Sequence, residues 1–136
     1  MMSRLSGFLT VALLGCGSSL PSPDATQQPL SAYVEVPYPP PAALAETVPE
    51  RPERDGVVWL DGEWSYHGDG YAWRRGGWVV PPPEGRFAPW RVWYRRDGRL
   101  MMAAGTWYGP GQVRLRRPDP VAPAATPANE VTSESQ

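Results

Sequence analysis

The amino-acid sequence predicts an all-β fold: a small antiparallel meander, forming a twisted sheet or a small open barrel, between disordered N- and C-terminal flanks. Asp-Gly pairs, which are among the strongest short-range hairpin signals, occur at 55–56, 61–62, 69–70 and 97–98. Short runs of alternating apolar and polar residues lie between these pairs, and no stretch keeps a helical periodicity over about ten residues. Such closely spaced turns are typical of small β domains.

The first residues are typical of a lipoprotein signal peptide, which we assign to residues 1–15. Their apolar run is too short to cross a bilayer as a helix, which takes about 20 residues. The run ends in Leu13-Leu14-Gly15-Cys16, which resembles a bacterial lipobox. The resemblance implies cleavage before Cys16, lipid attachment to this residue and stable membrane anchoring by two or more acyl chains. The alternative is an ordinary secretory signal in which Cys16 is coincidental.

The residue after the cysteine is Gly17 and not Asp. In proteobacterial lipoproteins this resembles the default for sorting to the outer membrane. We therefore expect a protein anchored in the bacterial cell envelope, and more specifically in the outer membrane.

The flanks are rich in proline and small residues. Residues 16–32 are predicted to be a disordered tether after the lipidated cysteine, with a reach of roughly 50 Å at ~3.1 Å per residue. Residues 33–54 are predicted to pack on the folded domain; Tyr33–Val36 reads as a possible strand and Pro37–Pro41 as polyproline II. Whether this segment joins the sheet stays open. Residues 118–136 are predicted to be a disordered tail.

The folded domain is predicted to span residues 55–117. The expected strands are 57–60, 63–67, 71–74, 77–80, 89–96 and 99–105, with 106–108 and 113–117 finishing the sheet. Across Asp69-Gly70, a two-residue loop would place Tyr66 opposite Trp73. Across Asp97-Gly98, it would pair Trp93 with Met102 and Val92 with Ala103.

A repeated motif, W-x-x-G-x-W, organises this domain. Complete copies lie at 59–64 and 73–78, and a third at 102–107 has Met in place of the first Trp. If Asp61-Gly62 and Arg75-Gly76 are two-residue hairpin loops, each complete copy pairs its own two indoles across a turn. The second loop could instead be a glycine bulge. The structural motif residues are Trp59, Gly62, Trp64, Trp73, Gly76, Trp78, Gly105 and Trp107.

The seven tryptophans all lie between residues 59 and 107. A domain this small cannot leave most of its large apolar side chains in water and still fold. Most of the tryptophans are therefore predicted to be structural. The exceptions we expect are one or two exposed indoles that stack on a ligand. The candidate binding residues are Trp90, Trp93, Arg91, Arg95 and Arg96.

Charge and composition exclude several function classes. Residues 55–117 contain ten arginines against six acidic residues, so the domain is basic and could meet an anionic polymer or lipid head groups, or simply be solvated. This segment has no cysteine, one histidine (His67) and one serine (Ser65), and no phosphate-binding loop. We therefore expect no catalytic residues, no metal site and no cofactor, and no nucleic-acid partner.

Residues 71–78, the following Val79-Val80-Pro81-Pro82-Pro83 and the proline cluster upstream of the first copy resemble the bacterial YXWGXW/WXXGXW repeat proteins. These are secreted or lipid-anchored envelope proteins of largely undefined function, and the resemblance covers roughly residues 33–108. It implies a non-enzymatic envelope module that is structural or binds another envelope protein. The alternative is a carbohydrate- or peptidoglycan-binding lipoprotein that uses the exposed Trp and Arg side chains.

Overall fold

The computed structural model describes residues 19–125, whose regular elements are short strands and two 3-10 turns. The strands are β1 Val34–Val36, β2 Val58–Leu60, β3 Glu63–Tyr66, β4 Tyr71–Arg74, β5 Gly77–Val79, β6 Arg86–Ala88, β7 Arg91–Tyr94, β8 Leu100–Ala103, β9 Thr106–Tyr108, β10 Arg114–Leu115 and β11 Ala122–Pro123. The 3-10 turns are η1 Leu30–Ala32 and η2 Pro110–Gln112. Paired strands run antiparallel, so the prediction of an all-β antiparallel fold is confirmed.

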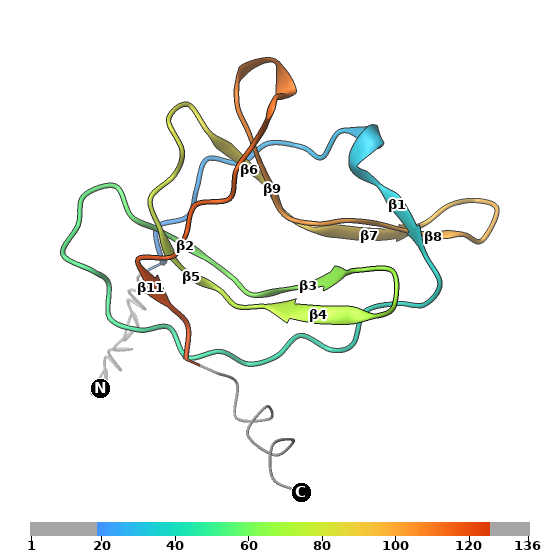
Figure 1. Ribbon diagram of the computed structural model, residues 1–136, viewed down its shortest axis with the longest axis horizontal. Helices are drawn as coiled ribbons and strands as arrows, with labels where there is room; N and C mark the ends of the chain where they lie inside the picture. The colour runs from blue at the N-terminus through green and yellow to red at the C-terminus, as the bar shows by residue number, and fades with distance from the viewer. Residues whose placement is uncertain (1–18, 126–136) are drawn as a thin grey trace, which may run out of the picture.

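The central strands form two long hairpins, each interrupted once along its length (Figure 1). In the first hairpin, β2 and β3 form one arm, and β4 and β5 form the other. In the second, β6 and β7 pair with β9 and β8 in the same way. The outer strands β1, β10 and β11 add to β8, β9 and β5. The interruptions divide the pairing into four small sheets.

The two complete W-x-x-G-x-W copies pair with each other. Trp59 lies opposite Trp78, and Trp64 lies opposite Trp73. The predicted pairing within each copy is therefore wrong, because residues 61–62 and 75–76 are interruptions within the arms and not turns. The indole rings of each observed pair are edge-on, with centroids 5.5 Å apart for Trp59 and Trp78 and 5.1 Å apart for Trp64 and Trp73.

Neither turn that reverses the chain is the predicted two-residue Asp-Gly loop, which shifts both hairpin registers. The first loop is Gly68-Asp69, because His67 N–H donates to Gly70 O at 3.0 Å. In the first hairpin the last pair is Tyr66 with Tyr71, so the predicted pairing of Tyr66 with Trp73 is wrong. Gly68, with a φ of 87°, takes the left-handed position in this turn.

In the second hairpin the predicted pairs are also wrong. Trp93 lies opposite Met101, and Val92 lies opposite Met102. Arg95 N–H bonds Arg99 O at 2.8 Å, and Gly98 has a φ of 84°. The loop is therefore the three-residue type that ends in a left-handed glycine, one residue longer than the predicted Asp97-Gly98 turn.

The second hairpin repeats the first. Trp59 opposite Trp78 corresponds to Phe87 opposite Trp107, shifted by 28 residues in one arm and 29 in the other. The Trp64–Trp73 pair corresponds in the same way to Val92 opposite Met102. The third motif copy is thus the returning arm of a second, diverged unit.

Two clusters of buried side chains join the hairpins. One packs Leu60 and Val79 of the first hairpin with Trp107 of the second. The other packs Leu100 and Met102 of the second with Tyr66 and Tyr71 of the first, together with Val36. A third cluster, built on Trp59 and Trp78, is closed by Ala124 near the end of the described chain. The core therefore depends on both hairpins and on both flanks.

Large parts of the flanks are ordered, which corrects the predicted tether and tail. Trp59 N–H donates to Pro21 O at 2.7 Å, and Thr26 N–H donates to Phe87 O at 2.9 Å. Residues 19–32 are therefore held on the domain by main-chain hydrogen bonds, although their composition has no apolar periodicity. At the other end, β11 pairs with β5. The predicted signal peptide, Cys16 and the end of the tail lie outside the described residues.

The proline-rich segment 33–54 lies against the first hairpin, and its first residues join the sheet as β1. In Figure 1 it runs along the outside of β4. Trp64 Nε1 donates to Ala42 O, and Trp78 Nε1 donates to Pro49 O, each at 3.0 Å. Two motif indoles thus donate hydrogen bonds to backbone carbonyls, which an extended proline-rich segment leaves without internal partners.

Candidate functional site

The glycines of the two complete motif copies converge on one carboxylate. Gly62 N–H donates to Glu46 Oε2 at 3.1 Å, and Gly76 N–H donates to both carboxylate oxygens at 3.0 and 3.1 Å. Trp73 Nε1 donates to Glu46 Oε1 at 2.9 Å. The backbone N–H groups at the interruptions in the two arms are therefore satisfied, because Glu46 accepts the hydrogen bonds that strand pairing does not use.

Glycine is required there because of space. A Cβ on Gly76 would lie 2.5 Å from Leu60 O and 2.8 Å from Gly62 N. A Cβ on Gly62 would collide with Trp73 and with the Glu46 carboxylate. In the two complete W-x-x-G-x-W copies, the glycine thus marks a close approach of two backbones around an acid, and not a turn.

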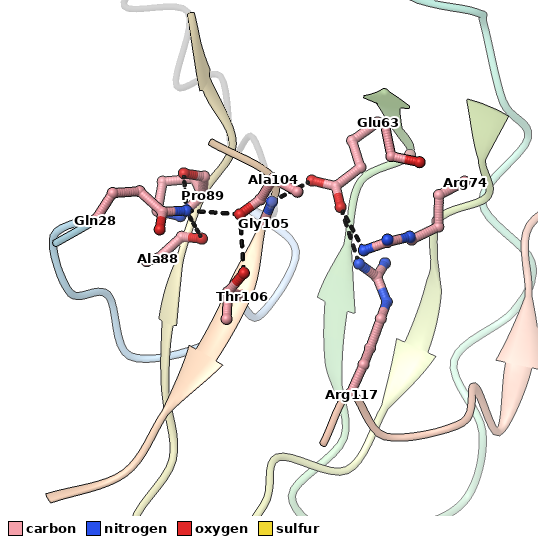
Figure 2. A network of polar contacts seen from close by, with 12 residues as sticks. Gln28, Glu63, Arg74, Ala88, Pro89, Ala104, Gly105, Thr106 and Arg117 are labelled. Atoms are coloured by element: carbon pink, nitrogen blue, oxygen red, sulfur yellow. Dashed lines mark hydrogen bonds and ion pairs between the residues drawn. The ribbon is translucent and has the colours of Figure 1, made fainter. Parts of the chain in front are cut away.

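The third motif glycine meets a second carboxylate, Glu63, whose side chain is only 3% exposed. Gly105 N–H donates to Glu63 Oε2 at 3.1 Å, and Arg74 and Arg117 each place Nη1 3.0 Å from Oε1 (Figure 2). Burial lowers the pKa of Arg117, Arg74 lowers it further, and Glu63 opposes both. The buried acid is fully partnered, as a buried charge must be.

On the other side of Gly105, Gln28 holds the matching interruption of the second hairpin. Its Nε2 lies 3.0 Å from Ala88 O, 3.0 Å from Pro89 O and 2.8 Å from Ala104 O (Figure 2). Gln28 therefore donates to carbonyls where Glu46 accepts from N–H groups. Each hairpin is fixed by one polar side chain from the part of the chain that precedes β2.

Three tyrosines cover one end of the first hairpin. Tyr71 Oη donates to Tyr38 O at 2.8 Å, and its ring packs edge-on against those of Tyr38 and Tyr66. Burial raises the pKa of Tyr71, and its neighbours Tyr38 and Tyr66 raise it further.

The predicted binding residues lie in and around β7. Trp90 and Trp93 are 37% and 43% exposed, unlike the motif indoles, which are buried or half-buried. Trp93 packs edge-on against Tyr33, with centroids 6.0 Å apart. Trp93, Tyr33, Arg91 and Gln28 line a shallow cavity of about 560 Å³. We call these four residues the β7 face.

The remaining predicted binding residues are not part of the β7 face. Trp90 is exposed but does not line its cavity. Arg95 lies in the β7–β8 turn, where its Nη2 is 3.3 Å from Asp97 Oδ2. Arg96 is exposed in the same turn.

A second cavity, of about 600 Å³, lies between the hairpins. Arg74 from the first hairpin and Arg114 of β10 both line it, with Ser65 and His67 at the end of β3. Ser65 Oγ is 2.8 Å from His67 Nε2. Among residues 19–125 no carboxylate bonds this histidine, so the pair lacks the third group that orients the base in a hydrolytic triad.

Within the described part of the chain, no group of histidine, cysteine and acidic side chains is arranged to hold a metal ion. No helix among these residues is long and apolar enough to cross a membrane. Comparison of the chain with protein-family models, with curated proteins and with solved structures finds no match.

The sequence analysis did not identify Glu46, Gln28 or Arg114. Glu46 and Gln28 lie in flanks whose composition gives no periodic signal, and Arg114 acquires its neighbours only when the hairpins pack. The one available signal was the glycine of the motif, since an interior strand glycine marks a close backbone approach as well as a turn.

Proposed function

We propose that this chain is a lipid-anchored, non-enzymatic module of the bacterial cell envelope that binds another envelope protein through the β7 face. The anchor is the lipidated Cys16 of the lipobox-like sequence. The outer membrane is the proposed location.

The observation that carries this proposal is the difference between the packed tryptophans of the motif and the exposed Trp93. The motif tryptophans pack in facing pairs or donate to Asp61, Ala42, Glu46 and Pro49. Trp93, by contrast, exposes 43% of its surface next to Tyr33 and Arg91. Aromatic and arginine side chains are enriched at the centres of protein interfaces. An aromatic residue left outside the core of so small a domain is available for a partner.

The test is site-specific photo-crosslinking in cells. A photoreactive phenylalanine analogue replaces Trp93 in the full chain, and the matched control carries it at Val121, which is 40% exposed and lies outside the β7 face. Discrete protein adducts at position 93 that are weaker or missing at position 121 support the proposal. Adducts of equal yield at both positions, or none at either, contradict it.

A glycan is the second candidate for this face. Trp93, Tyr33 and Arg91 line its shallow cavity, and an exposed indole beside polar side chains suits stacking against a sugar ring. In pull-downs with purified sacculi, Trp93→Ala should then lose binding while Val121→Ala keeps it. If neither variant nor the wild type is retained by sacculi, the glycan candidate is excluded and the protein partner stands.

A further inference from the structure

The cavity between the hairpins is separate from the β7 face and has a chemistry of its own. Its walls come from both hairpins, from the segment around Val34 and from β10. At about 600 Å³, it lies within the range of small-molecule sites, roughly 300–1,000 Å³. It is therefore large enough for a small organic molecule, and not only for an ion.

The charged side chains around this cavity are basic. Arg74 and Arg114 line it, and no aspartate or glutamate among the described residues does. Arg114 is exposed and forms no ion pair within residues 19–125. Nothing on the cavity wall therefore neutralises it.

Arg74 is held in place from behind. Its Nη1 is 3.0 Å from Glu63 Oε1, which Arg117 also contacts at 3.0 Å. One buried carboxylate thus faces two guanidinium groups, which leaves one positive charge that it does not neutralise. Arg74, one of the two, lines the cavity. Because Glu63 fixes Arg74, less side-chain entropy is lost when Arg74 binds a ligand.

We propose that this cavity binds a small anionic ligand that presents a carboxylate or a phosphate group to Arg74 and Arg114. Guanidinium groups match the planar geometry of both anions and form charge-assisted hydrogen bonds to them. The hydroxyls of Ser65 and Tyr108 and the side chain of Met102 also line the site, so a polar ligand body with one apolar face fits beside the anion.

The experiment titrates the full-length, isotope-labelled chain in detergent with inorganic phosphate, with glucuronate and with glucose, at constant ionic strength, and follows the amide signals by NMR. Phosphate or glucuronate should shift signals of residues around the cavity in a saturable manner, whereas glucose should shift them far less. The stronger of the two anions identifies the group that is recognised.

Arg114→Gln is the decisive variant, because the Arg114 side chain makes no hydrogen bond or ion pair within residues 19–125 and its replacement should leave the fold intact. It should weaken anion binding about tenfold or more, as expected for one charge-assisted hydrogen bond. Arg54→Gln removes the same charge from an exposed residue that lines neither this cavity nor that of the β7 face and should bind as the wild type does.

Two results would overturn the proposal: no saturable shifts around the cavity with either anion, or equal weakening by Arg114→Gln and Arg54→Gln, which indicates general charge screening. Neither result bears on the β7 face, whose variants and readout are different. Arg74→Lys offers a further check, because it keeps a charge near Glu63 but loses the bidentate fork and should also weaken binding.

Discussion

The backbone N–H of Gly76 donates to the carboxylate of Glu46, thirty residues earlier in the chain. Gly62 donates to the same carboxylate from the other arm of the hairpin. The two motif copies are therefore joined twice, by facing indoles and by a shared acid supplied from the proline-rich segment.

Replacing that acid should destabilise the domain. Glu46→Ala leaves the N–H groups of Gly62, Gly76 and Trp73 without their acceptor, and we expect a loss of about 2–4 kcal/mol in the free energy of unfolding. Urea denaturation followed by Trp fluorescence measures it. Glu53→Ala, at an exposed position without a hydrogen bond or ion pair among the described residues, is the control. Equal stability of the two variants would contradict the role assigned to Glu46.

The observed register predicts which tryptophans are energetically coupled. In double-mutant cycles with Trp→Leu substitutions, Trp64 and Trp73 should show a coupling of about 1 kcal/mol, because their rings are 5.1 Å apart. Trp73 and Trp78, which belong to the same motif copy, should be additive within about 0.5 kcal/mol. Coupling between Trp73 and Trp78 with additivity of Trp64 and Trp73 would contradict the observed register and support pairing within each motif copy.

The motif glycine Gly76 and the glycine beside the first turn, Gly70, should respond differently to alanine. Gly76→Ala forces a Cβ to within 2.5 Å of Leu60 O and should cost about 1–3 kcal/mol. Gly70→Ala meets only Tyr38 Oη at 3.8 Å and should change stability little. Thermal unfolding of both variants provides the comparison, and a Gly76→Ala protein as stable as Gly70→Ala would show that the close approach is not required.

The tyrosine cluster predicts a loss of stability at alkaline pH. The pKa of Tyr71 is raised in the folded state by burial first and then by Tyr38 and Tyr66. Folding therefore favours its neutral phenol. That contribution is complete below the unfolded pKa of about 10 and is lost as the pH rises through the higher folded pKa.

Unfolding free energies measured between about pH 9 and 12, a window around and above the ordinary tyrosine pKa, test this prediction. Absorbance titration of the phenolate provides a second measurement. Tyr71→Phe should be less stable at neutral pH, because it loses the bond to Tyr38 O, but should fall less steeply as the pH rises. Parallel pH profiles for the two proteins would contradict it.

The anchor is tested by fractionation. Cys16→Ala removes the thiol that a lipobox requires and should release the chain from the envelope membranes, since one hydrophobic signal alone gives only marginal binding. Cys16→Ser serves as a second variant with nearly the same side-chain volume. Retention of both variants in the membrane fraction would exclude lipidation as the anchor.

The sequence was sufficient to locate the strands but not to pair them. Asp-Gly pairs at 69–70 and 97–98 lie in or next to real reversals of the chain. The left-handed glycines of these turns are Gly68 and Gly98, and a left-handed glycine is a local requirement. Asp61-Gly62 has the same local composition but occurs within an arm. What distinguishes it is Glu46, which is distant in sequence and contributes only after the chain has folded.

The same limit applied to the candidate sites. The exposure of Trp93 beside Arg91 followed from composition, since both residues belong to one short strand. The basic cavity did not, because Arg74 and Arg114 come from different parts of the chain and are brought together only when β9 and β10 pack against the first hairpin. Spacing within a motif could not show that juxtaposition.

The hydrogen bond from Trp59 N–H to Pro21 O also limits how far the domain can stand from a bilayer. If Cys16 carries the lipid, the free connection between the lipid and the domain ends at Pro21 and not at residue 32. The five residue steps from Cys16 to Pro21 span at most about 18 Å. A connection of that length would hold the domain near the head groups and restrict its rotation. Partners close to the membrane surface would then be accessible to the domain, and distant ones would not.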